Sequence, residues 1–248
     1  RIYSQMGYAF AKHIFGIKGS YAVDPQKGAV VMTLTTQGDA PIHYTLDGSE
    51  PTAASPRYTG PVEIGKSARF RATALREGGE NASYSREFAF SKSTGRPAVL
   101  NTKPNDSYTF EGASLLVDGY HSRPVFTSGA WLGYLDEPLD VTIDMGGEQS
   151  YRSVELETLA EKGDWIFPPS SVTVWVSDNG TDFTEVASVA VPEAKAGDAD
   201  GIGRYRMQFP ETSARYLKVV AQNAAAIPAW HPGAGSKGFL FVDEVVVE

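Results

Sequence analysis

Residues 41–52 read Pro41-Ile42-His43-Tyr44-Thr45-Leu46-Asp47-Gly48-Ser49-Glu50-Pro51-Thr52. Ile42, Tyr44 and Leu46 alternate with polar residues, which predicts a strand with one apolar face. Asp47-Gly48 follows, and these residue types favour the positive φ of a tight turn. Because Tyr58-Thr59-Gly60-Pro61-Val62 then begins another predicted strand, this stretch indicates an antiparallel β fold.

A period of two recurs along the rest of the chain, and Gly, Pro, Asn and Asp separate the periodic segments at intervals typical of sandwiches and barrels. The predicted strands are Ala29–Thr35, Ile42–Leu46, Ala68–Leu75 and Arg86–Phe90, then Leu139–Met145, Ser153–Leu159, Val172–Ser177, Tyr205–Phe209, Arg215–Val220 and Leu240–Val247. Residues 8–15 have a pattern compatible with a helix but are too few to decide. We therefore expect an all-β chain.

The composition excludes several classes of function. A formal charge of −8 in 248 residues, without clustered Lys or Arg, argues against binding nucleic acid. No apolar run approaches the roughly 18 residues that would cross a bilayer, so we expect no membrane insertion. The absence of cysteine excludes disulfides and thiolate chemistry. The first residues hold neither an initiating Met nor a signal-peptide core, and we expect the chain to be part of a longer protein.

The first half, to about Lys92, resembles the small β-sandwich that follows the catalytic barrel in chitobiases and family 20 β-hexosaminidases. The second half resembles an F5/8 type C domain, the discoidin-like jelly roll that includes family 32 carbohydrate-binding modules. That resemblance is carried by residues 116–119, 139–146, 172–181 and 214–219. Trp165-Ile166-Phe167-Pro168-Pro169 and residues 228–235 are similar to loops of the version fused to hexosaminidases of Bacteroidetes.

These resemblances imply an immunoglobulin- or fibronectin-like β-sandwich followed by a discoidin-like, galactose-binding-like jelly roll. We expect the first domain at 1–92, with 1–15 as the remainder of a linker from a catalytic part. The run Ser91-Lys92-Ser93-Thr94-Gly95-Arg96-Pro97 is polar and rich in turn formers, which predicts a linker at 93–98. The second domain then covers 99–248.

No catalytic centre is predicted. The family that the first half resembles cleaves terminal N-acetylhexosamines with a consecutive Asp-Glu pair at the end of a barrel strand. Asp136-Glu137 and Asp243-Glu244 are the two such pairs here, and neither follows the alternating strands and helices of a barrel. We expect a non-enzymatic region of a chain whose missing part is a family 20 β-N-acetylhexosaminidase.

The jelly-roll resemblance implies sugar binding by loops at one end of the domain, through an aromatic face and a few polar groups. It places residues 128–134, 161–167 and 228–237 in these loops. The candidate contacts are Trp131, Tyr134, Asp164, Trp165, Trp230, His231 and Lys237. The alternative is that the tryptophans only pack the loops against the sheet. Trp175 alternates with two valines on a strand and is expected to be structural.

Family 32 modules commonly hold a structural calcium ion, and the resemblance implies that Asp118 and Glu244 match its carboxylate ligands. Arg123 lies where family members more often have a further ligand. It would bring positive charge close to the ion, and the alternative is that it pairs with Asp118 in place of calcium.

The expected function is that of a non-catalytic C-terminal accessory region. Its second domain would bind a glycan of the terminal galactose or N-acetylhexosamine class and keep the catalytic domain, its partner in cis, close to substrate. From the family, we expect a periplasmic, cell-surface or secreted location. Two alternatives remain: a structural brace or oligomerisation region that packs on the catalytic barrel, and a protein-binding module with exposed apolar loop tips.

Overall fold

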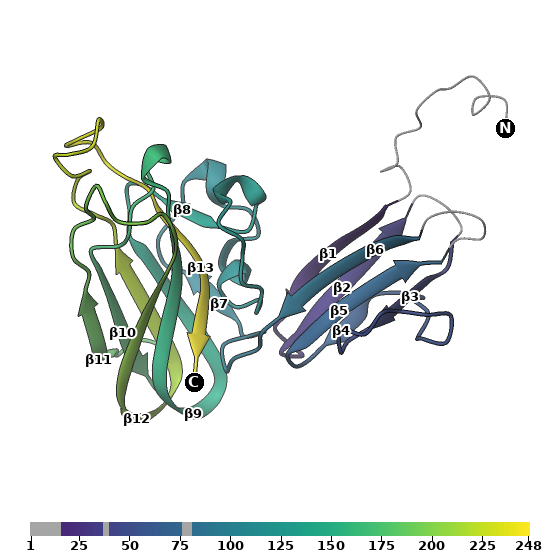
Figure 1. The fold of residues 1–248 in the computed structure, drawn as a ribbon. Coiled ribbons are helices and arrows are strands. Elements are labelled where there is room, and N and C mark those ends of the chain that lie inside the picture. Colours follow the sequence, from purple (N-terminus) through teal and green to yellow (C-terminus); the bar gives the residue numbers. More distant parts are fainter. Residues whose placement is uncertain (1–15, 37–39, 76–80) are drawn as a thin grey trace, which may run out of the picture. The chain divides into compact units, whose positions relative to one another are not determined.

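The computed structural model describes residues 16–36, 40–75 and 81–248. The possible helix at residues 8–15 and the linker expected at 1–15 lie outside these ranges. The chain forms two compact units (Figure 1). The first comprises Arg1–Ala22, as far as it is described, with Val30–Phe88, and the second comprises Val23–Ala29 with Ala89–Glu248.

The first unit is a sandwich of two three-stranded sheets, ordered β1-β2-β4 and β3-β5-β6. Its strands are β1 (Ile17–Asp24), β2 (Ala29–Thr36), β3 (Ile42–Thr45), β4 (Val62–Ile64), β5 (Ala68–Ala74) and β6 (Ala82–Phe88). The fully buried rings of Phe70 and Phe88 belong to its core. Tyr44 stacks on Phe70 with ring centroids 5.8 Å apart.

The stretch at 41–52 forms the strand and turn that its sequence predicts. β3 pairs antiparallel with β5, with Ile42 opposite Ala74. Gly48 has a φ of 84°, and the Asp47 carboxylate accepts hydrogen bonds from the backbone N–H and the hydroxyl of Ser49 at 3.0 and 2.6 Å. In this turn Gly48 supplies the positive φ and Asp47 supplies the side-chain acceptor, which are the properties that make these residue types common in turns.

The second unit is built on a seven-stranded sheet with the order β11-β10-β12-β9-β13-β8, and β7 also pairs with β9. Its strands are β7 (Ala98–Leu100), β8 (Leu132–Tyr134), β9 (Leu139–Ala160), β10 (Ser171–Ser177), β11 (Thr184–Ala190), β12 (Gly201–Gln222) and β13 (Leu240–Val247). Its helices are 3₁₀ turns: η2 (Asp106–Tyr108), η3 (Gly112–Leu116), η4 (Phe126–Ser128) and η5 (Lys162–Asp164). The all-β fold class is confirmed.

β9 and β12 are each one 22-residue strand where the sequence predicts two. They pair along their whole length, with register shifts between Gln208 and Thr212 and between Ala214 and Tyr216. The first part of β9 pairs with β7 and its last part with β13, so the two long strands pass from one layer of the jelly roll to the other. The polar residues at the bend hide this continuity in the sequence.

The core of the second unit lies between these layers. Alternate residues of β9, such as Val141, Ile143 and Met145, are fully buried, as are Leu217 and Val219 of β12. This alternation is what the period-two pattern predicts for a strand with one face in the core.

The segment at 93–98, predicted as a linker, instead packs within the second unit. Ser93 and Thr94 are buried. The Ser93 hydroxyl donates to the backbone carbonyl of Val245 in β13, and Gly95 N–H donates to Val117 O at 2.8 Å. Polar turn residues thus meet buried backbone groups here, a role that composition alone does not distinguish from a solvated linker. In the described part of the chain, no helix is both long and apolar enough to cross a membrane.

Candidate functional site

Three loops of the second unit surround the candidate site: 161–170 after β9, 191–200 after β11 and 223–239 after β12. The loops after β9 and after β12 lie at the same end of the unit (Figure 1). The first of them is pinned by Ile166 and Phe167, both buried. Phe167 N–H donates to Phe239 O at 2.9 Å, and Trp165 O accepts from Phe239 N–H at 2.8 Å.

Trp165 is turned outward by this anchoring. It ends η5 in the left-handed conformation, with a φ of 64°, and its side chain is 43% exposed. A bulky residue with positive φ is uncommon and persists when its surroundings hold it. The strained backbone therefore presents an indole to solvent, which is a feature typical of functional loops.

His231 is the centre of the site. Its imidazole is 9% exposed, Nδ1 accepts the Gly233 N–H at 3.0 Å, and Nε2 lies 2.9 Å from the carbonyl oxygen of Lys162. Because Nδ1 accepts, Nε2 carries the proton and donates, and both ring nitrogens are occupied. His231, a predicted sugar contact, is thus already committed to joining two loops.

Two indoles rest against this imidazole. Trp165 and Trp230 each meet His231 edge to face, with ring centroids 6.2 and 5.5 Å away. Trp230 is 40% exposed and donates its Nε1–H to Ala194 O at 2.9 Å. A Cβ on Gly233 would lie 2.8 Å from the ring of Trp165, so only glycine allows this approach. The result is a pair of fixed, half-exposed aromatic faces.

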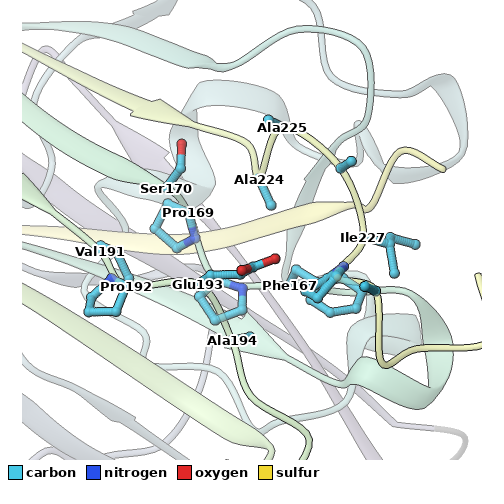
Figure 2. Close-up of a pocket in the computed structure, with 14 residues that line it drawn as sticks. Phe167, Pro169, Ser170, Val191, Pro192, Glu193, Ala194, Ala224, Ala225 and Ile227 are labelled. Atoms are coloured by element: carbon cyan, nitrogen blue, oxygen red, sulfur yellow. The ribbon is translucent and has the colours of Figure 1, made fainter. Parts of the chain in front are cut away.

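A groove of about 390 Å³ is lined by neither indole but includes Ala194, whose carbonyl accepts the Trp230 indole N–H (Figure 2). Its lining is formed by Phe167, Pro168, Pro169, Ser170, Val191, Pro192, Glu193, Ala194, Ala224, Ala225, Ala226, Ile227, Pro228 and Ala229. This volume falls within the range of about 300–1,000 Å³ usual for small-molecule sites. Sequence reasoning missed the wall at 191–194, because nothing in the residues Val-Pro-Glu-Ala indicates that Trp230 fixes them.

Trp131 and Tyr134 do not belong to this surface. Both are 0% exposed. Trp131 packs with Leu159, Ile166 and Phe241 and donates its Nε1–H to Arg123 O at 3.0 Å, while burial raises the pKa of the Tyr134 hydroxyl. As a correction to the predicted set, neither ring has a face left for a sugar.

The predicted polar contacts differ from one another in their surroundings. Asp164 is exposed in η5, beside Glu161, whose pKa is raised by burial and by the charge of Asp164. Lys237 is exposed and donates to Asp136 at 2.6 Å. Asp164 therefore lies in the loop that carries Trp165, whereas Lys237 forms a surface ion pair.

The predicted metal carboxylates lie in the interior. Asp118 is 3% exposed and its Oδ1 accepts from Tyr120 N–H at 2.7 Å. Glu244 is fully buried in β13, its Oε1 accepts from Gly119 N–H at 3.2 Å, and its Oε2 has no hydrogen-bond partner among the described residues. Burial and the nearby charges of Asp118 and Asp243 raise the pKa of Glu244 well above its usual range.

A buried ionic network, which the sequence did not reveal, lies near these carboxylates. Glu157 of β9 is fully buried and accepts hydrogen bonds from His121 Nδ1 at 2.7 Å and from Arg204. Burial favours a higher pKa for Glu157, but its two partners outweigh burial and the pKa is lowered. The hydrogen bond to Glu157 raises the pKa of His121.

Neither Asp-Glu pair is arranged for catalysis. Asp136 pairs with Lys237, and Glu137 accepts from Lys103 N–H at 2.8 Å on the surface. Asp243 and Glu244 are buried, and the Asp243 carboxylate accepts from the N–H and hydroxyl of Ser122 at 2.7 and 3.1 Å. One pair is occupied by surface contacts and the other has no access to substrate.

Comparison with known proteins identifies two families. A model described as the F5/8 type C domain matches residues 101–237, and one described as the chitobiase/beta-hexosaminidase C-terminal domain matches residues 21–86. Both domain resemblances stated from the sequence are thereby confirmed, and neither description is that of a catalytic domain. No curated protein matches the chain.

Several solved structures are similar to the chain. Chitosan-binding module 1 of a chitosanase/glucanase from Paenibacillus sp. IK-5 is 17% identical over 64% of this chain and 98% of that chain, with a TM-score of 0.42. The module CpGH89CBM32-5 from Clostridium perfringens, in complex with GalNAc-beta-1,3-galactose, is 16% identical over 61% and 94%, with a TM-score of 0.41. CBM32-3 from a family 31 glycoside hydrolase of Clostridium perfringens is 16% identical over 64% and 94%, also with a TM-score of 0.41.

Proposed function

The chain belongs to the F5/8 type C domain family, and on that premise we propose that its second unit is a carbohydrate-binding module. The observation that carries the proposal is the pair of half-exposed indoles, Trp165 and Trp230, held on the buried imidazole of His231. The C–H face of a pyranose is apolar, and a rigid aromatic face beside a groove suits it. Ordering this surface before binding lowers the entropy cost of capture.

The ligand class that we propose is a terminal galactose or N-acetylhexosamine. Affinity at one shallow site should be weak, about millimolar to tens of micromolar. The ring faces of Trp165 and Trp230 would carry the contact, with Asp164 as a polar neighbour on the first loop. Lys237 would join only by leaving Asp136.

The parent protein that we propose is a family 20 β-N-acetylhexosaminidase of the Bacteroidetes type, periplasmic, cell-surface or secreted. The match of residues 21–86 to the chitobiase/beta-hexosaminidase C-terminal domain supports this order of modules. The region itself would cleave no bond. It would bind glycan and raise the local concentration of chain ends at a catalytic domain in cis.

We also propose a structural calcium ion at Asp118 and Glu244. The buried, unpartnered Oε2 of Glu244 supports it, because a buried carboxylate oxygen without a donor is costly and a cation would satisfy it. Arg123 is exposed, unlike Asp118, which disfavours the alternative in which it replaces the ion. No group of three or more acidic, histidine or cysteine ligands is found in the described ranges, so backbone carbonyls or water would complete the coordination. When bound, the ion would neutralise the buried acids and fix the segment at 118–120.

The second candidate is a structural brace or oligomerisation region. The observation that favours it is that Trp131 and Tyr134 are buried and that both nitrogens of His231 are occupied. In that case the loops would serve packing alone.

The deciding experiment is a heteronuclear NMR titration that follows the indole N–H resonances. Galactose, N-acetylgalactosamine, N-acetylglucosamine and chitobiose are added with and without calcium. Saturable shifts at Trp165 and Trp230, with the buried Trp131 as internal control, are expected. Trp165→Ala and Trp230→Ala should each weaken binding about five- to thirtyfold, the equivalent of about 1–2 kcal/mol. No shift at about tens of millimolar sugar would favour the structural candidate.

A further inference from the structure

The groove beside Trp230 contains a single charged side chain. Of the residues that line it, only Ser170 and Glu193 have polar side chains, and the others are proline, alanine, valine, isoleucine and phenylalanine. The Ser170 hydroxyl already donates to Asn223 O at 2.9 Å. Glu193 is therefore the group left to recognise the polar part of a ligand.

The Glu193 carboxylate is free of protein partners. Within the described ranges it makes no hydrogen bond or ion pair, and its side chain is exposed. Figure 2 shows the carboxylate drawn between the side chains of Pro192 and Phe167. The following residue on the chain, Ala194, is held by the Trp230 indole N–H at 2.9 Å. The nearby Lys195 does not line the groove, and its backbone N–H donates to Asp198 at 2.7 Å.

This combination favours a cationic ligand with an apolar face. An unpaired carboxylate beside apolar walls attracts a cation more strongly than it would in open water. Neutral hexoses carry no such charge, whereas an ammonium group donates up to three hydrogen bonds to an anion. The proline and alanine side chains that line the groove would pack against the C–H face of a sugar ring.

We infer that the groove selects a hexosamine whose amino group is free and protonated, with the ammonium group donating to Glu193 and the ring lying along the wall toward Trp230. The inference rests on the proposed carbohydrate-binding function, and for this groove it replaces the N-acetylated sugar of that proposal with the free amine. The informative rival is the N-acetylated form of the same sugar. Alanine methyl groups would also accommodate an acetyl methyl, but that ligand brings no charge to Glu193.

The test compares β-1,4-linked trimers of glucosamine and of N-acetylglucosamine on the whole chain by calorimetry, with the Trp230 indole followed by NMR. Glu193→Gln keeps the size of the side chain and removes its charge. Glu211→Gln is the matched control, because Glu211 is exposed in β12 and does not line the groove. The control also measures the general attraction of a cationic trimer to a chain of net charge −8.

The wild-type chain should prefer the glucosamine trimer. Glu193→Gln should weaken that trimer about three- to tenfold, while the N-acetylated trimer changes by less than about twofold. Glu211→Gln should leave both trimers as in wild type, and the difference caused by Glu193 should shrink at about 0.5 M salt because of screening.

Other results separate the two proposals. If Glu193→Gln binds the glucosamine trimer like wild type, or if the N-acetylated trimer binds more tightly while the Trp230 indole shifts, the inference about the free amine is overturned and sugar binding stands. If neither trimer moves the indole resonances of Trp165 or Trp230, the carbohydrate-binding function falls and the amine inference falls with it.

Discussion

The imidazole of His231 lies edge-on to the indole of Trp230, with ring centroids 5.5 Å apart and planes at 83°. The same imidazole bonds the loop after β9 through Lys162 O. His231 therefore supports the exposed surface indirectly, because it fixes the positions of Trp165 and Trp230, whose indoles form that surface.

His231→Ala should destabilise the second unit by about 2–4 kcal/mol, because it unpairs the Gly233 N–H and the Lys162 carbonyl and leaves a gap beneath two indoles. His231→Asn and His231→Gln each keep a polar side chain that can bond to Gly233 N–H or to Lys162 O, so each should lose about half as much stability. Urea unfolding with Trp fluorescence measures this. A loss below about 0.5 kcal/mol for the alanine variant would show that the imidazole is not a fixed support.

Gly233→Ala should displace Trp165, since the added Cβ would lie 2.8 Å from the indole ring. We expect a changed Trp165 indole resonance and a stability loss of about 1–3 kcal/mol from overpacking. Gly197→Ala is the control, because a Cβ there meets nothing within 4 Å. Equal stability and the same Trp165 indole resonance in the two variants would contradict the close contact between Gly233 and Trp165.

The pair of His121 and Glu157 should make stability depend on pH. The raised folded pKa of His121 means that its contribution is complete below the ordinary imidazole value of 6.5 and is lost as the pH rises through the folded value. Glu157, with a lowered pKa, loses its contribution only as the pH falls below its ordinary value of 4.5 and through the folded one.

The stability advantage of wild type over His121→Gln should therefore be larger at about pH 5.5 than at about pH 8.5. Denaturant unfolding at both pH values, with the His121 ring protons followed by NMR, measures it. An advantage that is the same at both pH values would mean that the ion pair does not titrate as the geometry requires.

Calcium should raise the thermal midpoint of the wild-type chain, by about 2–4 °C for each kcal/mol of binding linkage. Glu244→Gln should abolish that shift, whereas Glu148→Gln, which alters an exposed residue of β9, should keep it. A chelator should reverse the effect in wild type. A thermal midpoint of the wild-type chain that does not change when calcium is added would contradict the proposed calcium site.

The sequence predicts strands where apolar and polar residues alternate clearly, and β2, β5 and β10 are confirmed, whereas the predicted strand Arg86–Phe90 covers only the end of β6. β1 is missed because Gly19 and Ser20 interrupt its pattern. Gly19 is needed there, since a Cβ would lie 2.3 Å from the ring of Tyr84. This requirement for glycine comes from Tyr84, which is distant in sequence, so it leaves no periodic pattern in the residues around Gly19.

Exposure within the loops is the part of the site that the sequence does not predict. Trp131 and Trp165 both follow turn-forming residues. Trp131 nevertheless packs on Leu159 and Phe241, whereas Trp165 is exposed to solvent. Local composition is similar in the two cases. The difference comes from which side of each loop meets the sheet, and that is decided by long-range packing.

β9 and β12 pair over nearly their entire length, and all three loops of the candidate site begin where a strand of that sheet ends. Substitutions at the exposed positions of 191–200 and 224–237 thus change what the surface offers while the interlayer core retains its contacts, whereas His231 and Gly233 also support the loops themselves. At those exposed positions, ligand choice can change without loss of stability. Exposed loop residues can therefore vary, in evolution or by design, while the scaffold beneath them stays the same.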